Sequence, residues 1–378
     1  MTTYRAAAIG DTGRGNYGHA IDLAWVGLPG VQYVAVADED ATGRHAAGVR
    51  TGAQRQYADY REMLEHERPD FVSVCPRWVD RHAEMVQACA AAGVRGVLLE
   101  KPMAGCLAEC DAMLAACERA GTQLAVAHGR RFDPWVQRLR ALLADGRIGP
   151  LRSISTHGKG DQRGGAEDLL VLGTHVLDLA RLFAGEVAWA WGRVTQGGRD
   201  LEPGDVIDGA EGMGPSGGDG VVACYAFHGG VSATFESRRE QGRGVPLFGL
   251  TLSGAEGILS YRCDQREPLY FYPRPAAEPG GDAAWTHLDA VDVELLADAP
   301  PACRRADLSR IQQQALDLIA AVEERREPYA NGTDGRAAVE MVAAVMESHR
   351  LGRRAPFPLA NRRNPYEVVL ESAGRQRQ

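Results

Sequence analysis

The chain lacks three features that mark large classes of proteins. No apolar run approaches the ~20 residues that a transmembrane helix needs, although 45% of the residues are hydrophobic. The opening MTTYRAAAIG has no basic stretch followed by an apolar region, the pattern of a secretory signal. Positive charge is not in excess, because 42 Lys and Arg face 50 Asp and Glu, for a net charge of −8. We therefore expect a cytoplasmic globular protein with no nucleic-acid or membrane partner.

Cysteine is present, but not in a metal-binding or redox pattern. The eight cysteines form no CxxC pair and no Cys/His cluster with zinc-finger spacing. Cys106, Cys110 and Cys117 lie on one helical face by their spacing, and a buried face of small residues is the ordinary explanation. We expect reduced thiols and no metal site.

The 378 residues are enough for two domains. Strands and helices alternate at first, which predicts a parallel sheet covered on both faces. After about residue 128 the strands cluster, which predicts a mostly antiparallel sheet. The sequence thus indicates an α/β protein with domains 1–127 and 128–378, ending in the polar arm Pro356–Gln378. The glycine-rich stretch Gly198–Gly220 is predicted to be a long functional loop.

Short runs mark the individual elements. The predicted strands of the first domain are Tyr4–Ile9, Val31–Ala37, Phe71–Cys75, Gly96–Leu99 and Gln123–Ala127, and its clearest helices are Val79–Ala92 and Leu107–Ala120. The predicted strands of the second domain are Leu151–His157, Val187–Val194, Gly220–Phe227, Val231–Ser237, Phe248–Ser253 and Gly257–Arg262. Its predicted helices are Pro134–Ala144, Leu169–Phe183, Leu308–Glu324 and Gly335–Arg350.

The first strand runs directly into a glycine-rich loop. Glycines let the backbone approach a pyrophosphate, and a following helix N-terminus offers free N–H groups. Two registers are open, because Gly13–Gly18 fits GxGxxG literally, whereas Gly10–Gly15 begins at the strand end but has Thr12 in the middle position. We favour a blended loop that holds a dinucleotide. Its predicted cofactor residues are Gly10, Thr12, Gly13, Arg14 and Gly15.

An acidic residue ends the second strand. Asp38 lies 20 residues beyond Gly18, and a carboxylate at this distance accepts hydrogen bonds from the adenosine ribose and repels a 2′-phosphate. NAD is therefore favoured as cofactor. NADP is not excluded, because Arg44 lies close in sequence and a guanidinium can meet a 2′-phosphate.

At Glu100-Lys101-Pro102, after a predicted strand, the sequence resembles the Gfo/Idh/MocA family of sugar and cyclitol oxidoreductases. The match extends over about residues 4–362. Its further motifs are Asp70–Pro76 with His82-Ala-Glu, Arg131-Phe-Asp-Pro134, Gly173-Thr-His175 with Asp178, and Gly254-Ala-Glu-Gly257.

The resemblance implies a Rossmann domain followed by an α/β domain with a large, mostly antiparallel sheet. It implies that the nicotinamide lies between the two, that Cys75, Pro76, Glu100 and Lys101 contact the cofactor, and that the open sheet face pairs subunits into a homodimer or homotetramer. The expected activity is hydride transfer between nicotinamide and a secondary alcohol carbon of a sugar, sugar derivative or cyclitol.

Such a reaction needs a base within reach of the hydroxyl proton. His175 is the expected base, because an ordinary imidazole titrates near pH 6.5, and Lys101 is expected to hydrogen-bond the substrate oxygen. Many family members carry an aspartate four residues before the histidine, where this chain has Val171. Asp178 is the expected substrate contact, and Asp168 is the alternative that compensates for Val171 or only caps the helix.

Three further polar residues suit a polyhydroxylated substrate, and two other functions stay open. The additional substrate-binding candidates are Arg131, His157 and Lys159. One alternative is a permanently bound NAD that oxidises a sugar transiently during epimerisation, elimination or glycoside cleavage. The other is a non-catalytic nucleotide-binding sensor or scaffold.

Overall fold

The computed structural model describes residues 3–241, 247–273, 284–289 and 295–376, and the chain divides into two compact units. Unit 1 comprises Met1–Phe132, Ala210–Met213 and Pro300–Arg336, and unit 2 comprises the remainder. The segment Pro300–Arg336 therefore belongs with the first unit, although in sequence it lies between two stretches of the second. No helix among the described residues has the length and apolar character needed to cross a membrane.

Unit 1 is built on a six-stranded parallel sheet in the order β3-β2-β1-β4-β5-β6. Its strands are β1 (Tyr4–Ile9), β2 (Val31–Ala37), β3 (Arg55–Tyr57), β4 (Phe71–Val74), β5 (Gly96–Leu99) and β6 (Gln123–Val126). The central strands β4 and β5 are buried at every residue, as expected for a sheet covered on both faces. The parallel sheet of the first domain is therefore confirmed.

The helices of unit 1 begin and end where local chemistry favours it. They are α1 (Ala41–Thr51), α2 (Tyr60–Glu67), α3 (His82–Ala91), α4 (Leu107–Ala120) and α8 (Arg310–Glu324), with the 3-10 segment η1 (Gly18–Trp25) after β1. The Asp40 side chain accepts from Gly43 N and caps α1 at its start, and Gly121 ends α4 in the left-handed conformation.

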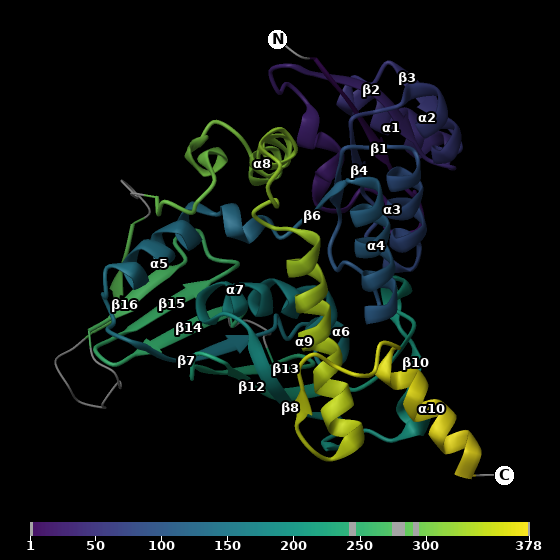
Figure 1. Ribbon diagram of the computed structural model, residues 1–378. Coiled ribbons are helices and arrows are strands. Elements are labelled where there is room, and N and C mark those ends of the chain that lie inside the picture. The colour runs from purple at the N-terminus through teal and green to yellow at the C-terminus, as the bar shows by residue number, and fades with distance from the viewer. Residues whose placement is uncertain (1–2, 242–246, 274–283, 290–294, 377–378) are drawn as a thin grey trace. The chain divides into compact units, whose positions relative to one another are not determined.

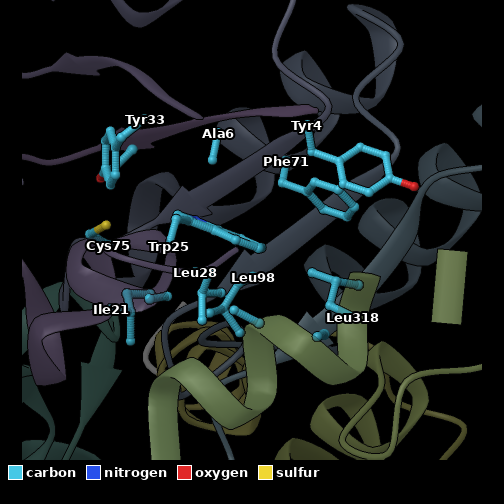
Figure 2. Close-up of a cluster of buried hydrophobic side chains, with 14 of the residues drawn as sticks. Tyr4, Ala6, Ile21, Trp25, Leu28, Tyr33, Phe71, Cys75, Leu98 and Leu318 are labelled. Atoms are coloured by element: carbon cyan, nitrogen blue, oxygen red, sulfur yellow. The ribbon is translucent and has the colours of Figure 1, made fainter. Parts of the chain in front are cut away.

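The core of unit 1 gathers side chains from distant parts of the chain (Figure 2). Trp25 and Phe71 stack at 5.2 Å between ring centroids, and Leu318 of α8 joins them. Because Leu318 is fully buried in this cluster, α8 is part of the hydrophobic core that holds the parallel sheet. This packing is why Pro300–Arg336 belongs to unit 1.

Unit 2 is built on a ten-stranded sheet in the order β17-β16-β15-β14-β7-β13-β12-β8-β18, with β9 paired to β8. Neighbouring strands run antiparallel except β7 and β13, which run parallel. The main strands are β7 (Leu151–His157), β8 (Val187–Gln196), β12 (Gly220–Phe227), β13 (Ser232–Arg238), β14 (Gly249–Gly254), β15 (Ile258–Arg262) and β16 (Leu269–Tyr272). The shorter ones are β9 (Arg199–Asp200), β17 (Thr286–His287) and β18 (Ala355–Pro356). The mostly antiparallel sheet is thus confirmed.

The helices of this second part of the chain are α5 (Pro134–Ala144), α6 (Ala166–Asp168), α7 (Thr174–Ala184), α9 (Gly332–Leu351) and α10 (Pro365–Gln376). Helices α5, α7 and α9 lie along one face of the sheet (Figure 1). The Tyr225 hydroxyl of β12, for example, donates to the Met341 carbonyl of α9 at 3.1 Å. Trp191 and Val222 of the neighbouring strands β8 and β12 remain 41% and 44% exposed.

Two local predictions were wrong, and a third was right only in part. The Pro356–Gln378 arm contains helix α10, which Asn364 and Tyr366 fasten to the carbonyls of Pro215 and Gly217. The Gly198–Gly220 stretch is not a plain loop, because β9, β10 (Ile207–Asp208) and β11 (Pro215–Ser216) lie within it. The predicted helix Leu169–Phe183 is helical throughout but not regular, because the π-helical turn Leu169–Gly173 precedes α7.

Candidate functional site: a dinucleotide loop and two titratable centres

The glycine-rich loop leaves β1 with the backbone geometry that only glycine accepts readily. Gly13 and Gly15 have φ angles of +90° and +98°. A Cβ on Gly15 would stand 2.4 Å from Arg77 N, whereas nothing lies within 4 Å of a Cβ on Gly13. The Cα of Gly13 is therefore unobstructed, while its N–H donates to Asn16 Oδ1 at 3.0 Å, and the backbone at Gly15 is pressed against the loop that follows β4. This cradle fits a dinucleotide phosphate.

The end of the loop differs from the expected regular helix. In η1, His19 and Ala20 have left-handed φ angles of 45° and 55°. The Tyr17 ring lies over Gly10, where a Cβ would stand 2.1 Å from Tyr17 Cζ. The space at Gly10 is thus filled by this chain's own aromatic ring.

Asp38 is buried, at 2% exposure, and its carboxylate faces the loop. Thr12 donates to it twice, from its backbone N–H at 3.2 Å and from its hydroxyl at 2.7 Å. Asp40 N donates at 3.0 Å. These contacts fix the carboxylate beside the phosphate cradle. The Thr12 contact is one that sequence reasoning did not anticipate.

Two nearby arginines have partners in the protein. Arg44 donates to the Asp38 carbonyl at 2.5 Å, so its guanidinium caps the end of β2. Arg14 stacks 4.6 Å above the Trp78 ring and forms an ion pair with Asp80. Both cations lie at the edge of the nucleotide loop.

At the carboxyl ends of β4 and β5 the predicted cofactor residues are brought close to this loop. The Cys75 carbonyl accepts from Gly18 N at 2.8 Å, while its side chain lies in the core and burial raises the pKa of the thiol. Glu100 is fully buried and is 2.5 Å from His19 Nδ1. Lys101 is 3% exposed, and the Lys101–Pro102 peptide bond is cis.

His175 stands in α7 directly after the π-helical turn. It is 9% exposed, and its ring lies 6.4 Å from that of Phe248. Asp178 is three residues further in the same helix, so the two side chains share a face, and it is 2% exposed. π turns occur often at functional sites, and this one lies immediately before the expected base.

Asp168 is held by other elements of unit 2. Its Oδ2 accepts from Gly160 N at 2.9 Å and from the Ser237 hydroxyl at 2.5 Å. That Asp168 compensates for Val171 stays a prediction; a π-helical turn lies between Asp168 and His175 in sequence. The Asp168 side chain makes no capping hydrogen bond to the helix that follows it.

The three further substrate candidates have different surroundings. Arg131 is buried and donates to the Tyr329 carbonyl at 2.8 Å and to Asp334 at 2.9 Å, so it ties two segments of unit 1 together. His157 is half-buried, and burial with the nearby Arg262 cation lowers its pKa. Lys159 is exposed and lies 3.3 Å from Asp264.

Comparison with known proteins decides the family. The model of an oxidoreductase family with a NAD-binding Rossmann fold, Gfo/Idh/MocA, matches residues 7–128. The D-apiose dehydrogenase of Paraburkholderia graminis is 30% identical over 349 residues, which are 87% of this chain and 84% of that protein. The chain belongs to the Gfo/Idh/MocA oxidoreductase family. It is therefore an NAD(P)-dependent oxidoreductase of an NAD-binding family.

Solved structures agree with this fold over nearly the whole chain. An oxidoreductase domain protein from Kribbella flavida has a TM-score of 0.72 at 26% identity and covers 95% of this chain and 100% of that one. An oxidoreductase from Agrobacterium radiobacter, in complex with NAD+, L-tartaric acid and magnesium, has a TM-score of 0.69 at 22% identity, with 94% and 98% covered.

Proposed function

We propose that this protein transfers a hydride between a nicotinamide cofactor and a secondary alcohol carbon of a sugar, sugar derivative or cyclitol. The observation that supports it most directly is Lys101, a buried lysine at the carboxyl end of a parallel strand in a dinucleotide-binding sheet. The relative named D-apiose dehydrogenase and the Thermotoga maritima protein named myo-inositol 2-dehydrogenase, 34% identical over 100 residues, support a polyhydroxylated substrate.

The cofactor, when bound, supplies the hydride acceptor. Gly13, whose Cα is unobstructed, and Gly15, which makes the tight turn, belong to the loop that would hold its phosphates, and Asp38 would accept hydrogen bonds from the adenosine ribose. The predicted cofactor contacts of Pro76 and Glu100 belong to the same proposal.

Side chains of the protein bind the substrate hydroxyl group and accept its proton in this proposal. We propose that Lys101 donates a hydrogen bond to the substrate hydroxyl oxygen, which stabilises the developing alkoxide. His175 accepts the hydroxyl proton, and Asp178 contacts the substrate or orients the imidazole from the same helical face. Asp168 fits a supporting role instead, because its carboxylate already bonds Gly160 and Ser237.

We also propose that a second copy of the chain covers the open face of the large sheet. Trp191 and Val222 belong to paired strands and lie exposed on this face. Apolar side chains grouped in this way are typical of a subunit interface. A homodimer or homotetramer follows.

Purified protein incubated with NAD or NADP and a panel of aldoses, aldonates and cyclitols tests the function. With at least one compound of the panel, we expect the absorbance of reduced nicotinamide to increase. We expect a faster increase with NAD than with NADP. NADH binding without turnover on the whole panel would contradict it. Nucleotide that co-purifies and resists dialysis would instead favour transient oxidation by a permanently bound cofactor.

A further inference from the structure

A buried histidine lies between the turn that follows β4 and the turn that carries Lys101. His82, the first residue of α3, is fully buried. Its Nε2 lies 2.7 Å from the Pro76 carbonyl oxygen, and its Nδ1 lies 3.1 Å from the Met103 carbonyl oxygen. The two ring nitrogens thus face two separate turns, one after β4 and one after β5.

The turn on the Nε2 side packs against the phosphate loop. The Cys75 carbonyl accepts from Gly18 N at 2.8 Å, and Arg77 N donates to the Gly15 carbonyl at 3.4 Å. Gly15 has no room for a Cβ against Arg77. The position of Pro76 is therefore coupled to the backbone that cradles the dinucleotide.

The turn on the Nδ1 side carries the proposed catalytic lysine. Met103 is two residues beyond Lys101 and is 1% exposed. A displacement of the Met103 carbonyl moves the short turn in which Lys101 sits. A misplacement of ~1 Å in a catalytic group costs on the order of 10²-fold in rate.

An imidazole suits this place because it has polar atoms on two edges of one rigid ring. In its neutral form one nitrogen donates and in its charged form both do. Burial lowers the pKa of His82, whereas the two carbonyls and the nearby Glu100 carboxylate favour the protonated ring. Because both partners are carbonyl oxygens, only the protonated ring donates to both turns, and the neutral ring donates to one of them.

We propose that His82 is a positioning residue that sets the Lys101 turn against the phosphate loop. The proposal rests on the proposed function for the role of Lys101. It separates two tasks on one ring: the Nδ1 edge holds the turn of Lys101, and the Nε2 edge holds the turn beside the dinucleotide.

Two conservative variants divide these tasks. His82→Asn places an amide nitrogen near the position of Nδ1 and loses the contact to Pro76. His82→Gln places its amide nitrogen near Nε2 and loses the contact to Met103. Thermal unfolding of both checks that the fold is kept.

The sequence offers an internal reporter for Lys101. The chain contains only two lysines, Lys101 and Lys159, and Lys159 is exposed. Labelling by an amine-directed acylating reagent, followed by peptide mass spectrometry, therefore gives the reactivity of Lys101 relative to Lys159 in the same molecule. This readout needs no substrate.

For His82→Gln we expect Lys101 labelling to change at least fivefold and kcat to fall at least tenfold, with the NADH dissociation constant within twofold of wild type. For His82→Asn we expect NADH binding to weaken at least fivefold, with Lys101 labelling within twofold. Equal changes in both variants that follow the loss of thermal stability would overturn the proposal, and so would unchanged labelling and binding. If wild type turns over no substrate, the proposed function fails, while labelling and NADH binding still decide the role of His82.

Discussion

At the scale of single residues, the choice between lysine and arginine is informative. Only two of the 42 Lys and Arg residues are lysines, and one of them is the buried Lys101. A guanidinium stays charged under all ordinary conditions, whereas an ammonium responds to its surroundings and offers a compact donor. One of the two lysines therefore lies buried at a position where proton chemistry is proposed.

Asp38 gives a prediction on cofactor choice. Replacing Asp38 by alanine removes an acceptor for the ribose hydroxyls and the negative charge that opposes a 2′-phosphate. Because a hydrogen bond to a charged group contributes about 1.5–3 kcal/mol, we expect the KM for NAD to rise about tenfold or more, with a smaller change for NADP. Steady-state KM values for both cofactors measure this. Equal increases for both would mean that Asp38 only supports the loop through Thr12.

The sequence predicts candidate site residues where a motif contains them, but it does not predict their hydrogen-bond partners. The glycines, Asp38 and Lys101 follow from short patterns at strand ends, and His175 follows from a motif in a predicted helix. The Thr12 contact to Asp38 and the two carbonyls that face His82 arise from packing between segments far apart in sequence. Local pattern contains no information on such contacts.

At the scale of elements, glycine and small polar residues predicted where several strands and helices begin and end. Strands β1, β2 and β5 and helices α4 and α5 begin and end as predicted. The π-helical turn at Leu169–Gly173 could not be predicted, because a run of apolar residues fits π and α turns equally. Helix α10 was missed because the polar, Arg-rich composition of this segment favoured a loose arm, whereas contacts of Asn364 and Tyr366 hold the helix in place.

A buried carboxylate links three elements of unit 1 and gives a prediction on pH. Glu67 ends α2, and its side chain accepts from Arg5 of β1 and from Arg55 and Tyr57 of β3. The Arg55 guanidinium in particular lowers the pKa of Glu67 below its ordinary value. A lowered folded-state pKa adds stability above the ordinary carboxyl range, and this stability is lost as pH falls through the folded pKa.

We expect Glu67→Gln to lose about 1–3 kcal/mol of unfolding free energy at neutral pH. The gap between wild type and variant should narrow as pH falls below about 4.5, where Glu67 becomes protonated in the unfolded and then the folded chain. Urea unfolding of both proteins from pH 7 to pH 3 measures the gap. A gap independent of pH would show that shape, not charge, is what Glu67 supplies.

At the scale of the whole molecule, the sequence predicted two sheets of opposite character but not the path of the chain through them. Helix α8 belongs to the core of unit 1 although it follows every strand of the unit 2 sheet except β18. The apolar face of α8 predicts that the helix packs against a core, but not against which of the two sheets. In the structure, Leu318 of α8 packs in the cluster that contains Trp25 and Phe71.

The open sheet face gives a prediction on assembly. Trp191→Glu places a charge in the proposed interface, so we expect the protein to shift from dimer or tetramer to monomer. Val49→Glu, on α1 at 70% exposure, is the matched control and should leave the assembly unchanged. Sedimentation velocity of the three proteins measures this. A wild-type protein that sediments as a monomer, or a Trp191→Glu variant that stays assembled, would contradict the proposal.

The central claim is that Lys101 promotes hydride transfer to nicotinamide, and one comparison tests it most directly. Wild type and Lys101→Met are compared for reduction of NAD by the best substrate of the panel, with NADH binding followed by nicotinamide fluorescence. Methionine keeps the length of the side chain without its charge or donor. We expect kcat to fall about 10²–10⁴-fold, the usual loss for a positioned proton-handling group, while the NADH dissociation constant stays within about threefold. A Lys101→Met variant with wild-type kcat would contradict the account.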